Sequence, residues 1–153
     1  MNHRLVFLSA IMTFVTAGCS GPTNEIHEVT GTAAERAAGV SRVIKSHAAV
    51  PSDITDAHLI EQQFGDGQLG PADYRSFVWI KVSPDDIAKW KSALKTPPTD
   101  SPAYDTPPTK PKWWLAESDY KKLTKYDSQA LFDRHGWIAI EDNGNIYAHT
   151  YTQ

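Results

Sequence analysis

The sequence predicts an α+β fold in one small domain, because helical and strand patterns occupy separate stretches of the 153-residue chain. Apolar residues alternate along residues 73–82, which is typical of a strand. Two further alternating runs within residues 137–150 are joined by Asn143-Gly144, which is typical of a β-hairpin. Three stretches combine helical spacing of apolar residues with helix-start residues: 32–49, 84–94 and 118–134.

The first strand is the clearest element of the sequence. Its two faces are both apolar at the centre, with Val78, Ile80 and Val82 on one face and Phe77 and Trp79 on the other. A strand that is apolar on both faces is covered on both sides of its sheet. We therefore expect this strand to lie in the interior of an antiparallel sheet.

The first two predicted helices have recognisable starts. Thr32 and Glu35 form a capping-box pattern, in which each side chain accepts a hydrogen bond from the other residue's backbone N–H. Pro51 is expected to stop this helix. In the second helix Ser83 is the expected cap, and Pro84 suits the first helical position, where no N–H is needed.

The third predicted helix, expected in one or two pieces, has Ser118 as its cap and Gly136 as its stop. The run from Leu59 to Phe64 fits either a short strand or a helical turn, and both alternatives stay open. Gly65-Asp66-Gly67, which follows, is interpreted as a turn because the companion residues of calcium and phosphate loops are missing.

The C-terminal hairpin has a predicted turn and register. Asn143-Gly144 indicates a tight type I′ turn, because both residues tolerate positive φ. The turn would join residues 137–142 to residues 145–150. With that register the cross-strand pairs are Ile140–Tyr147 and Ile138–His149.

The N-terminal residues form a targeting pattern. Arg4 gives a basic start, and Leu5 to Val15 are mostly apolar but too short for a spanning helix, which needs roughly 20 residues. Small residues then precede Cys19, the only cysteine of the chain. The run Val15-Thr-Ala-Gly18-Cys19 resembles the lipobox of bacterial lipoproteins, although Thr16 stands where leucine is usual.

The resemblance, which covers residues 1–19, implies processing and a location. Residues 1–18 would be removed by cleavage of the Gly18–Cys19 bond, and Cys19 would carry acyl chains on its sulfur and its new amine. Several acyl chains anchor a protein stably, since each buried CH₂ contributes about 0.8 kcal/mol. Ser20 is not an inner-membrane retention signal, so the resemblance favours the outer membrane, facing the periplasm. Residues 19–31 would then be a lipidated tether, and residues 32–153 a single domain.

Composition excludes several function classes. Without residues 1–18, 14 basic residues stand against 18 acidic ones, a formal charge of −4. Nucleic acid is therefore not an expected partner, because phosphate binding needs a basic surface. Once Cys19 is lipidated, no thiol remains for a disulfide, for thiol catalysis or for a zinc site. We expect no metal and no cofactor.

The candidate binding residues lie in and beside a proline-rich loop at 96–112. Tyr104 lies inside this loop, and Trp113 and Trp114 follow it directly. Aromatic faces beside rigid prolines can bind sugar rings or an extended peptide. The alternative is that the two tryptophans pin the loop to the core. A PxxP motif at 108–111 could be a partner's ligand or simply part of a rigid surface excursion.

The histidines are weak catalytic candidates. His135 and His149 lie near Glu141 and Asp142 in sequence, and a histidine beside a carboxylate can act as a general base. The predicted register, however, places His149 and Glu141 on opposite faces. No catalytic or metal-binding motif is present, so we do not expect an enzyme.

These observations lead to one main hypothesis and two alternatives. The main hypothesis is a lipid-anchored envelope protein that binds without catalysis. Its partner, besides the membrane, would be an envelope protein, such as an enzyme or toxin to be inhibited, or a cell-wall glycan. The first alternative is an unfamiliar hydrolase that uses His135 or His149. The second is a structural lipoprotein that links the membrane to the cell wall.

Overall fold

The structure, a computed structural model, describes residues 24–65, 71–94, 96–98 and 102–152. The predictions for residues 1–23, Cys19 included, and for the turn at Asp66-Gly67 lie outside the described residues. Within them, no helix combines the length and the hydropathy that crossing a membrane would require.

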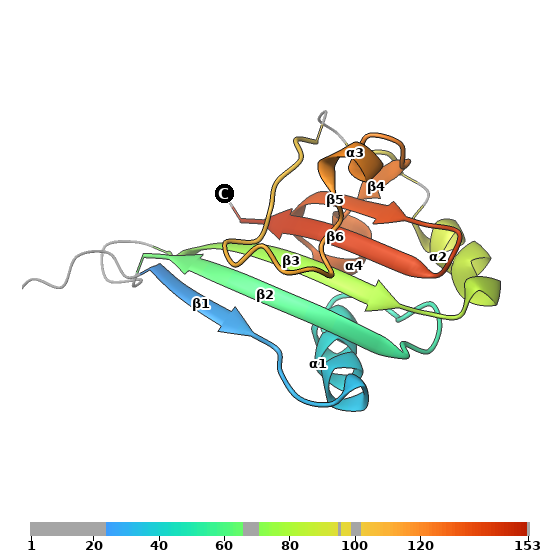
Figure 1. The fold of residues 1–153 in the computed structure, drawn as a ribbon, viewed down its shortest axis with the longest axis horizontal. Coiled ribbons are helices and arrows are strands. Elements are labelled where there is room, and N and C mark those ends of the chain that lie inside the picture. Colours follow the sequence, from blue (N-terminus) through green and yellow to red (C-terminus); the bar gives the residue numbers. More distant parts are fainter. Residues whose placement is uncertain (1–23, 66–70, 95, 99–101, 153) are drawn as a thin grey trace, which may run out of the picture.

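Six antiparallel strands form one sheet in the order β1-β2-β3-β6-β5-β4 (Figure 1). The strands are β1 Asn24–Glu28, β2 Asp56–Phe64, β3 Asp73–Lys81, β4 Lys125–Asp127, β5 His135–Ile140 and β6 Asn145–Tyr151. The predicted strand at 73–82 is β3, and it lies between β2 and β6 as an interior strand should. Residues 59–64, for which both a strand and a helical turn were open, form part of strand β2.

The helices are α1 Ala33–Lys45, the short 3₁₀ turn η1 Pro84–Asp86, α2 Ile87–Ala93, α3 Glu117–Tyr120 and α4 Gln129–Phe132. The capping box that starts α1 is present, with hydrogen bonds in both directions between Thr32 and Glu35. One local prediction is wrong, since α1 ends at Lys45, well before Pro51. Ser83 is the cap residue of η1 and Pro84 its first residue, as predicted, although the serine side chain makes no capping hydrogen bond.

Both faces of the sheet are covered by other segments, and the fold is of the predicted α+β class. Figure 1 shows α1 on one side of the sheet and the segment with α3 on the other. On the helix side, Val78 and Ile80 of β3 pack in one cluster with buried residues of α1, α2 and α4. On the other side a smaller, aromatic cluster contains Leu115, Tyr120 and Trp137. The two apolar faces predicted for β3 are thus both used.

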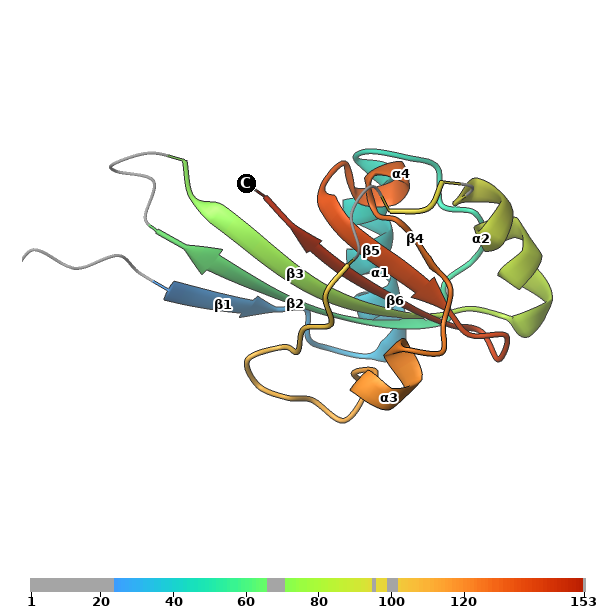
Figure 2. The same ribbon diagram turned by 90° about the horizontal axis from the view of Figure 1, so that it is seen from above.

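The predicted tether at residues 19–31 is wrong for the part that the structure describes. Residues Asn24–Glu28 form β1, and Val29 donates a backbone hydrogen bond to the Leu59 carbonyl at 3.0 Å. All five residues of β1 are exposed, so the strand shows no apolar alternation that the sequence could reveal. Backbone pairing to β2 holds it at the edge. Figure 2 shows that β1 begins at the same end of the sheet where the chain ends.

The predicted helix at 118–134 is confirmed only as two short pieces, α3 and α4, because β4 interrupts it. Ser118 lies inside α3, whose cap position is occupied by Ala116. Asp133, with a φ of 50°, ends α4, whereas Gly136 belongs to β5. A strand of three residues is too short to produce a readable pattern, and its pairing with β5 overrides the local preference for helix.

The C-terminal hairpin is confirmed, but its turn and register differ from the prediction. Gly144 donates to the Glu141 carbonyl at 3.2 Å, and Glu141 donates to the Asn145 carbonyl at 2.9 Å. Only Gly144 of the pair has a positive φ, of 92°, which fits a type I turn followed by a bulge instead of type I′. The register moves by one residue, so Ile138 pairs with Ala148. His149 now pairs with Trp137, on the aromatic side of the sheet.

Candidate functional site

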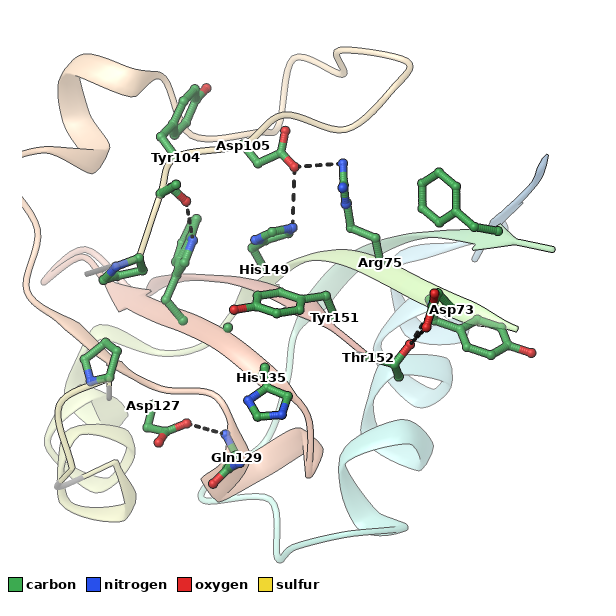
Figure 3. A pocket seen from close by; sticks show the side chains of 17 residues that line it. Asp73, Arg75, Tyr104, Asp105, Asp127, Gln129, His135, His149, Tyr151 and Thr152 are labelled. Atoms are coloured by element: carbon green, nitrogen blue, oxygen red, sulfur yellow. Dashed lines mark hydrogen bonds and ion pairs between the residues drawn. The ribbon is translucent and has the colours of Figure 1, made fainter. Parts of the chain in front are cut away.

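A cavity of about 610 Å³ lies at one end of the aromatic side of the sheet, between the strand ends and the segment around Tyr104 (Figure 3). Its volume falls in the range of roughly 300–1,000 Å³ that is typical of small-molecule sites. Its aromatic lining consists of Phe64, Tyr74, Tyr104, Trp137 and Tyr151, together with two histidines. Strands β3, β5 and β6 position most of these side chains.

Three polar side chains from distant parts of the sequence meet in this cavity. Arg75 of β3 and His149 of β6 both point toward Asp105 in the covering segment (Figure 3). The Arg75 Nη1 atom lies 3.0 Å from Asp105 Oδ2, and His149 Nε2 lies 3.7 Å from the same oxygen. Arg75 also lies over the ring of Phe64, with 5.4 Å between the guanidinium carbon and the ring centroid.

Hydrogen bonds fix the covering segment, and with it Asp105. The indole of Trp114 donates to the backbone carbonyl of Asp105 at 2.9 Å. The hydroxyl of Tyr104 donates to the carbonyl of Leu115 at 2.8 Å, and the indole of Trp137 donates to that of Ala103 at 3.2 Å. These three aromatic side chains thereby hold the backbone around Asp105 against the sheet.

His149 is the most unusual group of the cavity. It is 7% exposed and stacks on Phe77, with ring centroids 4.9 Å apart. Burial lowers its pKa to about 4; the carboxylate of Asp105 opposes this shift and the charge of Arg75 adds to it. The imidazole is therefore neutral at pH 7. Among the described residues its Nε2 atom has no hydrogen-bond partner, since 3.7 Å to Asp105 is too long for one.

The opposite wall of the cavity carries groups that are already satisfied or exposed. The backbone N–H of Gln129 donates to Asp127 Oδ1 at 2.9 Å, and the backbone N–H of Tyr74 donates to Thr152 at 2.7 Å. His135 is exposed and stacks on Tyr151 with ring centroids 5.9 Å apart. The unsatisfied polar atom thus lies at the Asp105 side of the cavity.

The three predicted binding residues have different places in the structure. Tyr104 lines the cavity, whereas neither Trp113 nor Trp114 is among its described lining residues. Both tryptophans are half-buried. Trp113 stacks on His58 at 5.1 Å, and Trp114 meets Phe77 edge-on at 5.3 Å. The alternative interpretation, in which they pin the loop to the sheet, is the one that the structure supports.

The PxxP motif at 108–111 does not form an extended ligand. Lys110 donates a backbone hydrogen bond to the Pro107 carbonyl at 3.0 Å, and its φ is 47°. These are features of a turn and not of polyproline II, in which φ is near −75°. The interpretation of this motif as a polyproline ligand is therefore wrong for these residues.

The two candidate histidines, His135 and His149, line the same cavity, but the carboxylates near them in sequence, Glu141 and Asp142, are not among its described lining residues. Glu141 instead accepts hydrogen bonds from the side chains of Asn143 and Asn145 in the hairpin turn. Asp105 takes its place, and no local sequence pattern links it to either histidine. Arg75 had a usable signal that sequence reasoning missed, because it shares a face of β3 with Phe77 and Trp79.

Neither sequence nor structural comparison places this chain in a family. No protein-family model, no curated protein and no solved structure matched it. The function must therefore be argued from the cavity itself.

The groups that line the cavity can hold a ligand. No serine, cysteine or lysine is found among the described residues that line it. In the described part of the chain, no cluster of three or more histidine, cysteine or acidic residues is arranged to hold a metal ion. The groups present can orient a ligand by hydrogen bonds from the Arg75 guanidinium, to the Asp105 carboxylate and to or from the His149 imidazole.

Proposed function

We propose that this protein is a lipid-anchored binding protein of the bacterial cell envelope, and that its domain holds a small polar ligand in the cavity beside His149. The ligand would be bound and released unchanged. Two independent features support the proposal. The lipobox-like run that ends at Cys19 supports the anchor, and the cavity with its convergent polar groups supports the binding function.

The observation that carries the binding function is the unpartnered Nε2 atom of His149. A buried polar atom without a hydrogen bond costs about 1–3 kcal/mol of stability. His149 lines the cavity, and this atom lies just behind the cavity surface, beside the Arg75–Asp105 ion pair. A ligand group that bonds to Nε2 recovers this free-energy cost on binding, and the recovered free energy adds to the affinity for the ligand.

The anchor can be tested with Cys19→Ser. The wild-type chain, expressed in bacteria fed a fatty-acid label, should carry the label and fractionate with the outer membrane. The variant should carry none, because a serine hydroxyl does not replace the thiol in the thioether linkage. The acyl label decides the matter, since an uncleaved segment 1–18 could hold the variant at the membrane by itself. A labelled variant would disprove the anchor.

The binding function can be tested without assuming the class of ligand. The full-length chain, purified in a detergent without a sugar headgroup, is incubated with low-molecular-weight solutes of an envelope extract, and retained compounds are identified by mass spectrometry. We expect one compound to be retained with its mass unchanged. Arg75→Met should retain it at least tenfold less.

The matched control is Arg42→Met, which removes an exposed arginine of α1 on the far face of the sheet. It should behave like the wild type. Retention of nothing by the wild type, or equal retention by Arg75→Met, would contradict a ligand in this cavity. A product of altered mass would show catalysis instead.

A further inference from the structure

We propose that the ligand of the cavity is a neutral saccharide, one of whose hydroxyl groups bonds to His149 Nε2 and Asp105 Oδ2. This inference rests on the binding function proposed above and names its ligand class. It is drawn from the balance of charges in the cavity, the geometry at His149 and the distribution of flat apolar surfaces.

The charges of the cavity disfavour an anion. Histidines apart, the acidic side chains Asp73, Asp105 and Asp127 outnumber the single basic one, Arg75, among the described lining residues. Arg75 is already paired with Asp105 at 3.0 Å. The low pKa of His149 removes a second source of positive charge at pH 7. A carboxylate or phosphate ligand would thus enter a site of net negative formal charge.

The charges also disfavour a cation at the His149 end. Arg75 already pairs with Asp105 there, so this carboxylate has no uncompensated charge for a ligand ammonium. His149 offers a neutral ring whose polar atom is buried. A neutral ligand group with hydrogen-bonding capacity is the remaining choice for this end of the cavity.

A hydroxyl group matches the geometry between His149 and Asp105 in either tautomer of the imidazole. If Nε2 carries no proton, the hydroxyl donates a hydrogen bond to it. If Nε2 carries a proton, the hydroxyl accepts a hydrogen bond from this N–H and donates one to Asp105. Nε2 is inaccessible in the ligand-free protein and lies 3.7 Å from Oδ2, so the hydroxyl reaches Nε2 only when the Asp105 side chain turns aside.

The rest of the lining suits a ring with one apolar face and polar edges. The aromatic rings of Tyr104, Trp137 and Tyr151 line the cavity beside the planar polar groups of Arg75 and Asp105. A sugar ring has C–H groups on its faces, which pack on aromatic surfaces, and hydroxyls at its edge, which bond to such polar groups. A peptide suits the cavity less well, because it would bring its ionised ends or its backbone N–H groups into the same space.

The test is a titration of the full-length chain, in detergent without a sugar headgroup, with probes of one ring type and different charge. The neutral probes are N-acetylglucosamine, its disaccharide, galactose and mannose. The charged probes are glucosamine and glucuronic acid, and a dipeptide of alanine represents the other source of small polar ligands. Calorimetry measures affinity, and the ¹⁵N shift of the His149 imidazole reports its hydrogen bond.

We expect at least one neutral sugar to bind at least tenfold more tightly than the charged sugars and to shift the His149 signal. His149→Phe should lower that affinity at least tenfold. His47→Phe, which changes an exposed histidine on the helix side of the sheet, should leave it unaltered. Thermal unfolding of both variants shows that they are folded.

The possible failures are distinguishable. Preferential binding of a charged sugar or of the dipeptide would overturn the saccharide class and leave the binding function standing. The same holds if no sugar binds while the envelope extract yields a retained compound. Binding of a neutral sugar that His149→Phe does not weaken would overturn the assignment to this atom. Binding of no probe and of no extract solute would overturn both proposals.

Discussion

Replacing His149 by phenylalanine should stabilise the folded protein at pH 7 by about 1–3 kcal/mol. Phenylalanine keeps a flat ring against Phe77, whose centroid lies 4.9 Å from that of the imidazole, and it removes the buried Nε2 atom that has no partner among the described residues. Urea unfolding of the two proteins measures the difference. Stabilisation together with the loss of ligand would show that this position serves binding at the expense of stability.

The stability difference between wild type and His149→Phe should grow as the pH falls. Burial holds the pKa of His149 near 4 in the folded state, against 6.5 for an ordinary histidine. Between these two pKa values the imidazole is protonated in the unfolded chain but not in the folded chain. The wild type therefore loses stability as the pH falls from about 6.5 toward 4. The loss is about 2 kcal/mol at pH 5 and about 3 kcal/mol at pH 4. His149→Phe lacks this contribution.

Urea unfolding measures this effect at pH 7 and at pH 5. At each pH the free energy of unfolding of His149→Phe is compared with that of the wild type, and the two differences are then compared. His47→Phe is the control, since it replaces an exposed histidine on the other face of the sheet. A gap between wild type and His149→Phe that does not change with pH would mean that the buried imidazole is not held neutral. The argument that the cavity lacks a second positive charge would then fail as well.

The second large effect is expected for Gly136→Ala, which should destabilise the domain by about 4 kcal/mol or more. Gly136 has a φ of 132°, and an added Cβ would stand 2.0 Å from the backbone oxygen of His149. It would also come within 2.9 Å of the Cα of Thr150. These are backbone atoms of the neighbouring strand β6, so relief requires β5 and β6 to separate beside the cavity.

Gly65→Ala is the matched control for this change. Gly65 also has a positive φ, of 85°, but its added Cβ would meet no atom of the described residues within 4 Å. Only the conformational strain remains, about 1–2 kcal/mol. Urea unfolding at pH 7 compares the two variants. Equal losses would mean that the close approach of β5 to β6 at Gly136 costs nothing and that the strands can adjust.

The sequence predicted those parts of the fold in which local preference and burial agree. The interior strand β3 has large apolar residues on both faces, and α1 begins with a complete capping box. Both are confirmed. The edge strands β1 and β4 were missed because their existence depends on a partner strand and not on their own pattern. No window of the sequence contains that information.

The candidate site was predicted in part, and one error in register explains much of what was missed. A type I′ turn at Asn143-Gly144 would have paired His149 with Ile138. The observed turn pairs it with Trp137, on the side that the covering segment occupies. Asp105 belongs to a loop whose position depends on contacts such as that of Trp114, so its approach to His149 could not be read from sequence spacing.

The early start of β1 limits how far the cavity can stand from the membrane. If Cys19 carries the lipid, only Ser20 to Thr23 separate it from Asn24, and five Cα–Cα steps span about 18 Å at most. Asn24 pairs with Phe64, which itself lines the cavity. The cavity would then lie close to the bilayer, at the anchored end of the domain. Its ligand would have to come to the membrane surface, or be part of a molecule already held there.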